Sequence, residues 1–217
     1  MDILTAMQER KSVRAYLDKQ VARRDIEEIL AAACLAPSAI NLQPWEFIVT
    51  YGEEKERLAR RLLKARSERV VACGPGTDKP LPAIISRRAK EALAVMEPPI
   101  ATLGLTFNEF VEAGSCAFYG APVAIMVTID KLFPTIRYLD VGLAVAQLLL
   151  AAHAKGLATC PIGLILSYRA DIAEALNIPE QKELLLGIAL GYADESAPAN
   201  AFRTGRADLA EFATWYE

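Results

Sequence analysis

A short basic segment near the start of the chain has the residue types that bind phosphate. It reads Arg10-Lys11-Ser12-Val13-Arg14, with three cations and one hydroxyl in five positions. Guanidinium and ammonium groups form charge-assisted hydrogen bonds with phosphate oxygens, and arginine can form two at once. A segment of this kind, taken by itself, is more often a solvated surface run. It is therefore a candidate anion site that needs further ligands.

A second basic group lies at the other end of the chain, in Asn200-x-x-Arg203-x-x-Arg206. If the two groups converge in the fold, they can bind one phosphate together. Their spacing does not show whether they meet. The chain as a whole is not basic, because 24 Lys and Arg stand against 27 Asp and Glu. The net charge of −3 excludes an overall basic field for nucleic acid.

A polar loop between a predicted helix and a predicted strand is a further candidate for ligand binding. It begins at Pro37, ends before Trp45, and offers the side chains of Ser38, Asn41 and Gln43. Loops held by rigid elements often carry binding residues. The alternative, an ordinary connection between a helix and a strand, stays open at this point.

Several kinds of chemistry are excluded by what the sequence lacks. His153 is the one histidine in 217 residues, which removes zinc sites that need two or more, and we interpret it as a core or helix-end residue. There is no G-x-G-x-x-G after a strand, no P-loop, no H-E-x-x-H and no G-x-S-x-G. The four cysteines are widely spaced, as is typical of separate thiols in a reducing cytoplasm: Cys34, Cys73, Cys116 and Cys160.

Hydrophobic periodicity predicts the elements that position these residues. Helices are expected over 2–10, 24–36, 53–69, 83–96, 107–119, 135–155 and 169–177, and strands over 45–51, 123–129, 157–160 and 184–190. We expect Pro98-Pro99 to end the fourth helix, 97–107 to be a mobile loop or lid, 73–82 to be a loop, and Pro161-Ile162-Gly163 to be a turn. The order lacks a repeating βαβ pattern, which favours one α+β domain over 1–217 with a mixed sheet.

The predicted helix 135–155 is apolar nearly all round. Between Asp140 and Lys155 its strongly polar side chains are Gln147 and His153. Such a helix is buried in a core or an interface, and in a short chain this indicates a helix shared with a second subunit. The longest charge-free run, 113–129, contains two glycines and a proline and falls short of the roughly 20 apolar residues of a membrane span. The N-terminus also lacks the pattern of a signal peptide, so we expect a cytoplasmic protein that does not cross a membrane.

Taken together, five motifs resemble those of the FMN-dependent nitroreductase family, and they occur in the family's order. They are R-[RK]-S-V-R-x-[FY] at Arg10 to Tyr16, P-S-x-x-N-x-Q-P-W-x-F at Pro37 to Phe47, D-x-G-x-x-x-x-Q-[LM]-x-L-x-A at Asp140 to Ala152, G-L-x-T-C-P at Gly156 to Pro161 and N-x-x-R-x-x-R at Asn200 to Arg206. Each motif is weak by itself, and the ordered set is specific. The T-C-P-x-G sequence after the long helix resembles the branch of nitrobenzene and nitrobenzoate reductases.

The resemblance implies a nitroreductase-like fold, in which helices surround a mixed, mostly antiparallel sheet and dimerisation completes the domain. It also implies a homodimer with two FMN sites at the subunit interface. The residues expected at the phosphate and ribityl end are Arg10, Lys11, Ser12, Arg203 and Arg206, and Arg14 is expected beside the pyrimidine edge. Those expected from the partner subunit are Pro37, Ser38, Ala39 and Asn41. Those expected along the isoalloxazine ring, with a backbone N–H near N5, are Pro161, Ile162 and Gly163.

The implied activity is ping-pong hydride transfer from NADH or NADPH, by way of FMN, to a nitroaromatic, quinone or similar small-molecule acceptor. The flavin carries the chemistry, so neither a catalytic side chain nor a metal is expected, which agrees with the lone histidine. Two alternatives stay open: a flavoenzyme of the same fold with different chemistry (dehalogenation, azoline oxidation or flavin cleavage), and a non-enzymatic FMN-binding redox sensor.

The chain also departs from the family pattern in two places. The turn 161–164 lacks the acid that larger members carry in P-x-E-G, which slightly favours the redox sensor, and Ala39 stands where many relatives have a second serine. The region 73–112 is expected to shape the substrate pocket.

Overall fold

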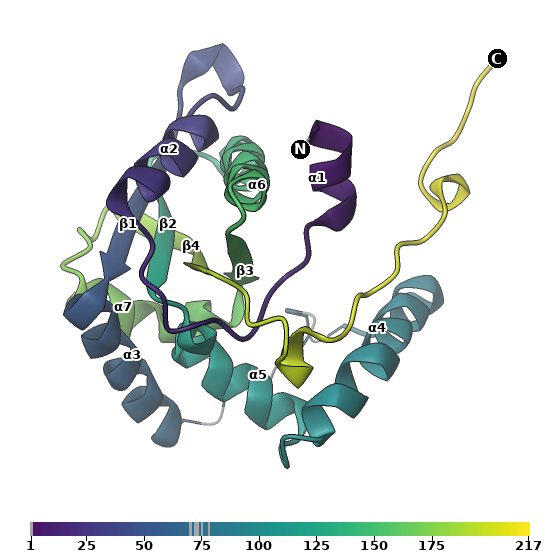
Figure 1. Ribbon diagram of the computed structural model, residues 1–217. Coiled ribbons are helices and arrows are strands. Elements are labelled where there is room, and N and C mark those ends of the chain that lie inside the picture. Colours follow the sequence, from purple (N-terminus) through teal and green to yellow (C-terminus); the bar gives the residue numbers. More distant parts are fainter. Residues whose placement is uncertain (1, 70, 72–73, 75, 78) are drawn as a thin grey trace.

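The computed structural model describes residues 2–69, 71, 74, 76–77 and 79–217. Figure 1 shows a central sheet with helices on both faces and a C-terminal segment that extends past α4, away from the sheet. Cys73, and with it the start of the loop expected over 73–82, lies outside the described residues.

The sheet contains four strands within the described part of the chain, in the order β1-β2-β4-β3. Every neighbouring pair is antiparallel, and an isolated parallel bridge joins Ser12 to Thr159 of β3. The predicted α+β class with a mostly antiparallel sheet is therefore confirmed. The strands are β1 (Trp45–Tyr51), β2 (Val123–Asp130), β3 (Ala158–Ile162) and β4 (Lys182–Gly191).

Helices cover both faces of this sheet, which is why the central strand β2 is apolar along nearly its whole length. Alternate side chains of β2 point to opposite faces: Ile125 packs in the core under α2 and α6, and Met126 packs in the core with α3. The helices are α1 (Ile3–Glu9), α2 (Arg23–Ala33), α3 (Gly52–Ser67), α4 (Ala83–Ala101), α5 (Phe107–Cys116), α6 (Tyr138–Ala154) and α7 (Arg169–Ala175). Short 3₁₀ turns occupy Ala39–Asn41, Phe118–Gly120, Thr135–Arg137, Leu164–Tyr168, Pro198–Asn200 and Leu209–Glu211.

The prediction that Pro98-Pro99 end the fourth helix is wrong, because α4 runs through both prolines to Ala101. Consequently 97–101, part of the expected mobile loop, is helical. Proline has a φ that suits a helix, and its cost is the missing N–H, which leaves the carbonyl four residues earlier without a helical partner. Those carbonyls belong to Ala94 and Val95, which lie on the exposed side of α4, where water can hydrate them.

The predicted turn Pro161-Ile162-Gly163 is also partly wrong. Pro161 and Ile162 belong to β3, where they lie opposite Ile188 and Gly187 of β4. β3 is an edge strand, and a proline is tolerated there because one side of the strand has no neighbouring strand that needs its N–H. Gly163 is the first residue beyond the strand.

Helix α6 lies across one face of the sheet with much of its apolar surface uncovered. Within the described residues, the stretch Thr135–Ala154 is the one helix long and apolar enough to cross a membrane by length and composition, with a mean hydropathy of 1.4. Only 28% of its most apolar window is buried in this chain. Core helices of proteins outside membranes meet the same criterion, so this finding by itself is weak evidence for a span.

Candidate functional site

The basic segment 10–14 leaves the end of α1 and runs beside β3. Ser12 forms the parallel bridge with Thr159, and the Val13 N–H donates to the Thr159 carbonyl at 3.0 Å. The Val13 side chain is buried, which anchors the middle of the segment to the core. The side chains on either side of Val13 are therefore held at the sheet edge.

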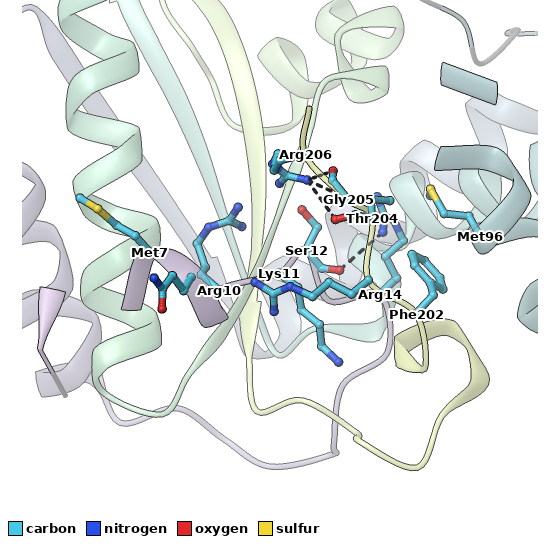
Figure 2. Close-up of a pocket in the computed structure, with 12 residues that line it drawn as sticks. Met7, Arg10, Lys11, Ser12, Arg14, Met96, Phe202, Thr204, Gly205 and Arg206 are labelled. Atoms are coloured by element: carbon cyan, nitrogen blue, oxygen red, sulfur yellow. Dashed lines mark hydrogen bonds between the residues drawn. The ribbon is translucent and has the colours of Figure 1, made fainter. Parts of the chain in front are cut away.

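The two basic groups converge, a point that their spacing left open. Both line one cavity of about 570 Å³, which Figure 2 shows between the segment 10–14 and the tail 202–206. The lining residues are Met7, Gln8, Arg10, Lys11, Ser12, Arg14, Met96, Phe202, Arg203, Thr204, Gly205 and Arg206. Among the expected site residues, six therefore meet here: Arg10, Lys11, Ser12, Arg14, Arg203 and Arg206.

Most of the positive charge in this cavity has no acidic partner among the described residues. Burial lowers the pKa of the Arg10 guanidinium below its ordinary value, and the positive charges of Arg206 and Arg203 lower it further. Its Nη1 atom is buried and has no hydrogen-bond partner among the described residues. None of the described residues that line the cavity is acidic. A partly buried cation without a partner is unfavourable, and an anion bound here would relieve it, which fits a phosphate group.

The other cations differ in how far their own chain already engages them. The Lys11 ammonium donates to the Asn200 carbonyl at 2.7 Å and lies 3.4 Å from Glu195. Arg203 donates to the Glu9 carbonyl at 2.8 Å, and Arg206 donates to the Gly205 carbonyl at 2.9 Å.

Arg14 is engaged more weakly. Its side-chain hydrogen bond to the Ser12 carbonyl is long at 3.5 Å, and its guanidinium lies 5.9 Å from the centre of the Phe202 ring. Arg10 and Arg14 are therefore the cations most available to a ligand.

The loop 37–43 lies elsewhere in the chain. It packs against the start of α6, where the Ala39 N–H donates to the Asp140 carboxylate at 3.4 Å, and Ser38 Oγ accepts from the Gln43 N–H at 2.9 Å. Ile40, Asn41 and Gln43 have positive φ angles, a strained backbone that often occurs at functional sites. None of Pro37, Ser38, Ala39 and Asn41 lines the basic cavity.

The residues Pro161, Ile162 and Gly163 follow directly on the part of β3 that Ser12 and Val13 contact. Ile162 is buried and Gly163 is exposed. They lie outside the lining of the cavity within this chain.

Sequence reasoning missed six of the lining residues. Phe202, Thr204 and Gly205 lie inside the motif Asn200 to Arg206, so the motif itself was the signal. Met7 and Gln8 precede the basic segment, and Met96 comes from α4, within the region 73–112.

Cys160 lies on β3 close to the cavity and is expected to be unreactive. Burial raises the pKa of its thiol to about 11, against the opposing effect of Arg14 and Arg10, and burial also raises that of Cys116 to about 11. The thiolate is the reactive form, so both thiols stay protonated near pH 8 and react slowly. We expect iodoacetamide to modify the exposed Cys34 and to spare Cys116 and Cys160, as measured by peptide mass spectrometry. Labelling of Cys160 as fast as that of Cys34 would contradict this environment.

Comparisons with known proteins place this chain among relatives of matching size. The model of the nitroreductase family matches residues 7–192. A 4-nitrobenzoate reductase from Pseudomonas putida is 33% identical over 206 residues, covering 91% of this chain and 88% of that protein. A nitrobenzene nitroreductase from Ectopseudomonas oleovorans is 28% identical over 219 residues, covering 96% and 94%. The structure of the FMN-dependent nitroreductase NfnB from Mycobacterium smegmatis, in complex with NADPH, superposes with a TM-score of 0.87 at 29% identity over 100% of both chains.

Proposed function

This chain belongs to the nitroreductase family, and from that premise we propose that it is an FMN-dependent oxidoreductase that uses NADH or NADPH to reduce nitroaromatic, quinone or similar acceptors. When bound, FMN supplies the chemistry of hydride transfer, accepting from the nicotinamide and donating to the acceptor. The observation that carries the proposal in this chain is the basic cavity, where a half-buried Arg10 with an unpartnered Nη1 lies near the tail arginines.

Different residues of the cavity would bind different parts of FMN. Arg10, with Arg203 and Arg206, would bind the phosphate through charge-assisted hydrogen bonds, while Lys11 and the Ser12 hydroxyl would complete the phosphate and ribityl end. Arg14 would lie by the pyrimidine edge, where its fixed charge favours the reduced, more negative form of the ring. Pro161, Ile162 and Gly163 would lie along the ring system and offer a backbone donor that needs no ionisable side chain.

A second copy of the chain would complete the site. The outward face of α6 carries Leu139, which is 65% exposed, and Leu143, which is 47% exposed. These two residues recur at helical spacing and form an apolar surface suited to an interface. The loop residues Pro37, Ser38, Ala39 and Asn41, which lie outside the basic cavity of their own chain, would then reach the cavity of the partner subunit. We also propose a cytoplasmic location, because Cys34, Cys116 and Cys160 are free thiols.

Replacing Arg14 by alanine is expected to weaken FMN binding and to lower the reduction potential of the bound flavin. A cation beside the pyrimidine edge stabilises the reduced form more than the oxidised form, so its loss shifts the potential downward. We expect a shift of roughly 30 mV, which corresponds to a tenfold change in a two-electron equilibrium. A titration against a reference dye measures it, and Arg14→Lys, which keeps the charge, is expected to restore part of it. An unchanged potential and affinity in Arg14→Ala would refute this placement of Arg14.

A further inference from the structure

Asn200 has a buried side chain that bonds the two walls of the basic cavity, the segment 10–14 and the tail 202–206, to each other at one end. We call this set of contacts the joint. The residue is 3% exposed. Its Oδ1 accepts from the Arg14 N–H at 2.7 Å, and its Nδ2 donates to the carbonyls of Ala15 and Asp194, both at 2.8 Å. Its own carbonyl accepts from the Lys11 ammonium at 2.7 Å. Four bonds therefore connect one residue of the tail to the segment 11–15 and to the turn at 194.

These contacts require an amide. One atom of the side chain must accept from a backbone N–H while the other donates to two carbonyls, and asparagine offers this combination. Aspartate, of the same shape, has no donor when ionised and would place negative charge against the carbonyls of Ala15 and Asp194. Both amide hydrogens of Asn200 are used within the protein, and the side chain does not line the cavity. Asn200 therefore acts through its neighbours.

The neighbours of Asn200 on both sides belong to the cavity. Arg14, whose N–H donates to Asn200, lies in one wall of the cavity, and the tail that follows Asn200 supplies Phe202 to Arg206 in the other wall. Figure 2 shows Ser12 and Arg14 near Thr204 and Gly205 among the residues that line the cavity. Asn200 therefore connects the segment that carries Arg10 to the tail that carries Arg206 through hydrogen bonds that use neither of these two side chains.

We propose that Asn200 is a positioning residue that holds the two walls at the spacing needed to bind one phosphate, a role that rests on the proposed binding of FMN. If these contacts of Asn200 are lost, the two walls can move apart, and Arg10 no longer binds the phosphate together with Arg203 and Arg206. Contacts to the ring system are less affected. The affinity for FMN falls more than the affinity for riboflavin, which lacks the phosphate.

The test compares the dissociation constants of FMN and riboflavin for the wild-type protein, Asn200→Ala and Asn200→Asp, measured by quenching of flavin fluorescence. We expect the preference for FMN over riboflavin to fall about tenfold or more in both variants. The matched control is Thr50→Val, which removes a buried hydrogen bond from Thr50 on β1 to the Ala124 carbonyl on β2, and both residues lie outside the cavity lining. This control is expected to lower the melting temperature and to keep the FMN preference.

Several results would overturn the role of Asn200. One is an unchanged preference for FMN over riboflavin in both variants. Another is a loss of that preference in Asn200→Asp alone, which would reflect the added charge. The third is an equal loss of the preference in Thr50→Val. A wild-type protein that binds neither flavin would instead refute the proposed function. Should the variants fail to fold, hydrogen exchange of the wild-type Arg14 N–H decides the matter. Slow exchange without FMN supports a joint formed in advance, and rapid exchange contradicts it.

Discussion

Replacing Arg10 by methionine is expected to weaken FMN binding about 10- to 100-fold without destabilising the protein that lacks flavin. A hydrogen bond between charged groups contributes about 1.5–3 kcal/mol, which gives this range of affinity. The melting temperature of the apoprotein is expected to stay the same or to rise. The burial that lowers the pKa of Arg10, together with its buried, unpartnered Nη1, indicates a charge that is unfavourable without a ligand. Titration with FMN measures the first effect, and the melting temperature of the apoprotein measures the second.

The control for this experiment is Arg24→Met. Arg24 lies on α2 with an exposed side chain that pairs with Glu28 at 2.8 Å, and it lies outside the cavity lining. An exposed pair contributes little to stability, so both the FMN affinity and the melting temperature are expected to stay near the wild-type values. If Arg10→Met kept the wild-type FMN affinity, the phosphate would have to bind elsewhere.

The double variant Leu139→Glu and Leu143→Glu is expected to convert a dimer into a monomer and to abolish tight FMN binding with it. Two carboxylates on the outward face of α6 cannot be buried against a second copy without a large desolvation cost. Because the proposed site needs the loop 37–41 of the partner subunit, FMN affinity should fall by at least about tenfold when the subunits separate. Analytical ultracentrifugation gives the oligomeric state, and FMN titration of the same samples gives the affinity.

Leu63→Glu serves as the control for the double variant. Leu63 is partly exposed on α3, and α3 packs with the core on the face of the sheet opposite α6. We expect this protein to remain dimeric and to bind FMN as the wild type does. A double variant that is monomeric and still binds FMN tightly would show that the site is complete within one chain.

Local signals in the sequence predicted most elements of the fold. The strand expected over 45–51 coincides with β1, because its aromatic and β-branched residues suit a pleated, half-buried surface and turn residues flank it. The errors arose where tertiary structure outweighs a local rule. Pro98-Pro99 remain helical because the carbonyls of Ala94 and Val95, which lose their helical partners, lie on an exposed side of α4, and Pro161 joins β3 because pairing with β4 extends an edge strand.

The candidate site was predicted only in parts. The residue types of 10–14 and 200–206 indicate an anion, but their meeting depends on the path of the chain around the sheet, which no local pattern encodes. Asn200 illustrates the same limit, since its place in the motif was visible and its bonds to Arg14 and Ala15 were not. Sequence patterns report which residues are present near an element, and long-range contacts determine which of them face the same cavity.

The most direct test of the central claim is the absorption spectrum of the purified protein, followed by anaerobic addition of NADH or NADPH. We predict a yellow protein with one FMN per chain, whose flavin absorption is lost on addition of at least one of the two nicotinamides and returns when a nitroaromatic acceptor such as nitrobenzene is added. A colourless protein that also fails to take up added FMN would contradict the account. A flavin that neither nicotinamide reduces would contradict the proposed activity while leaving the cofactor in place.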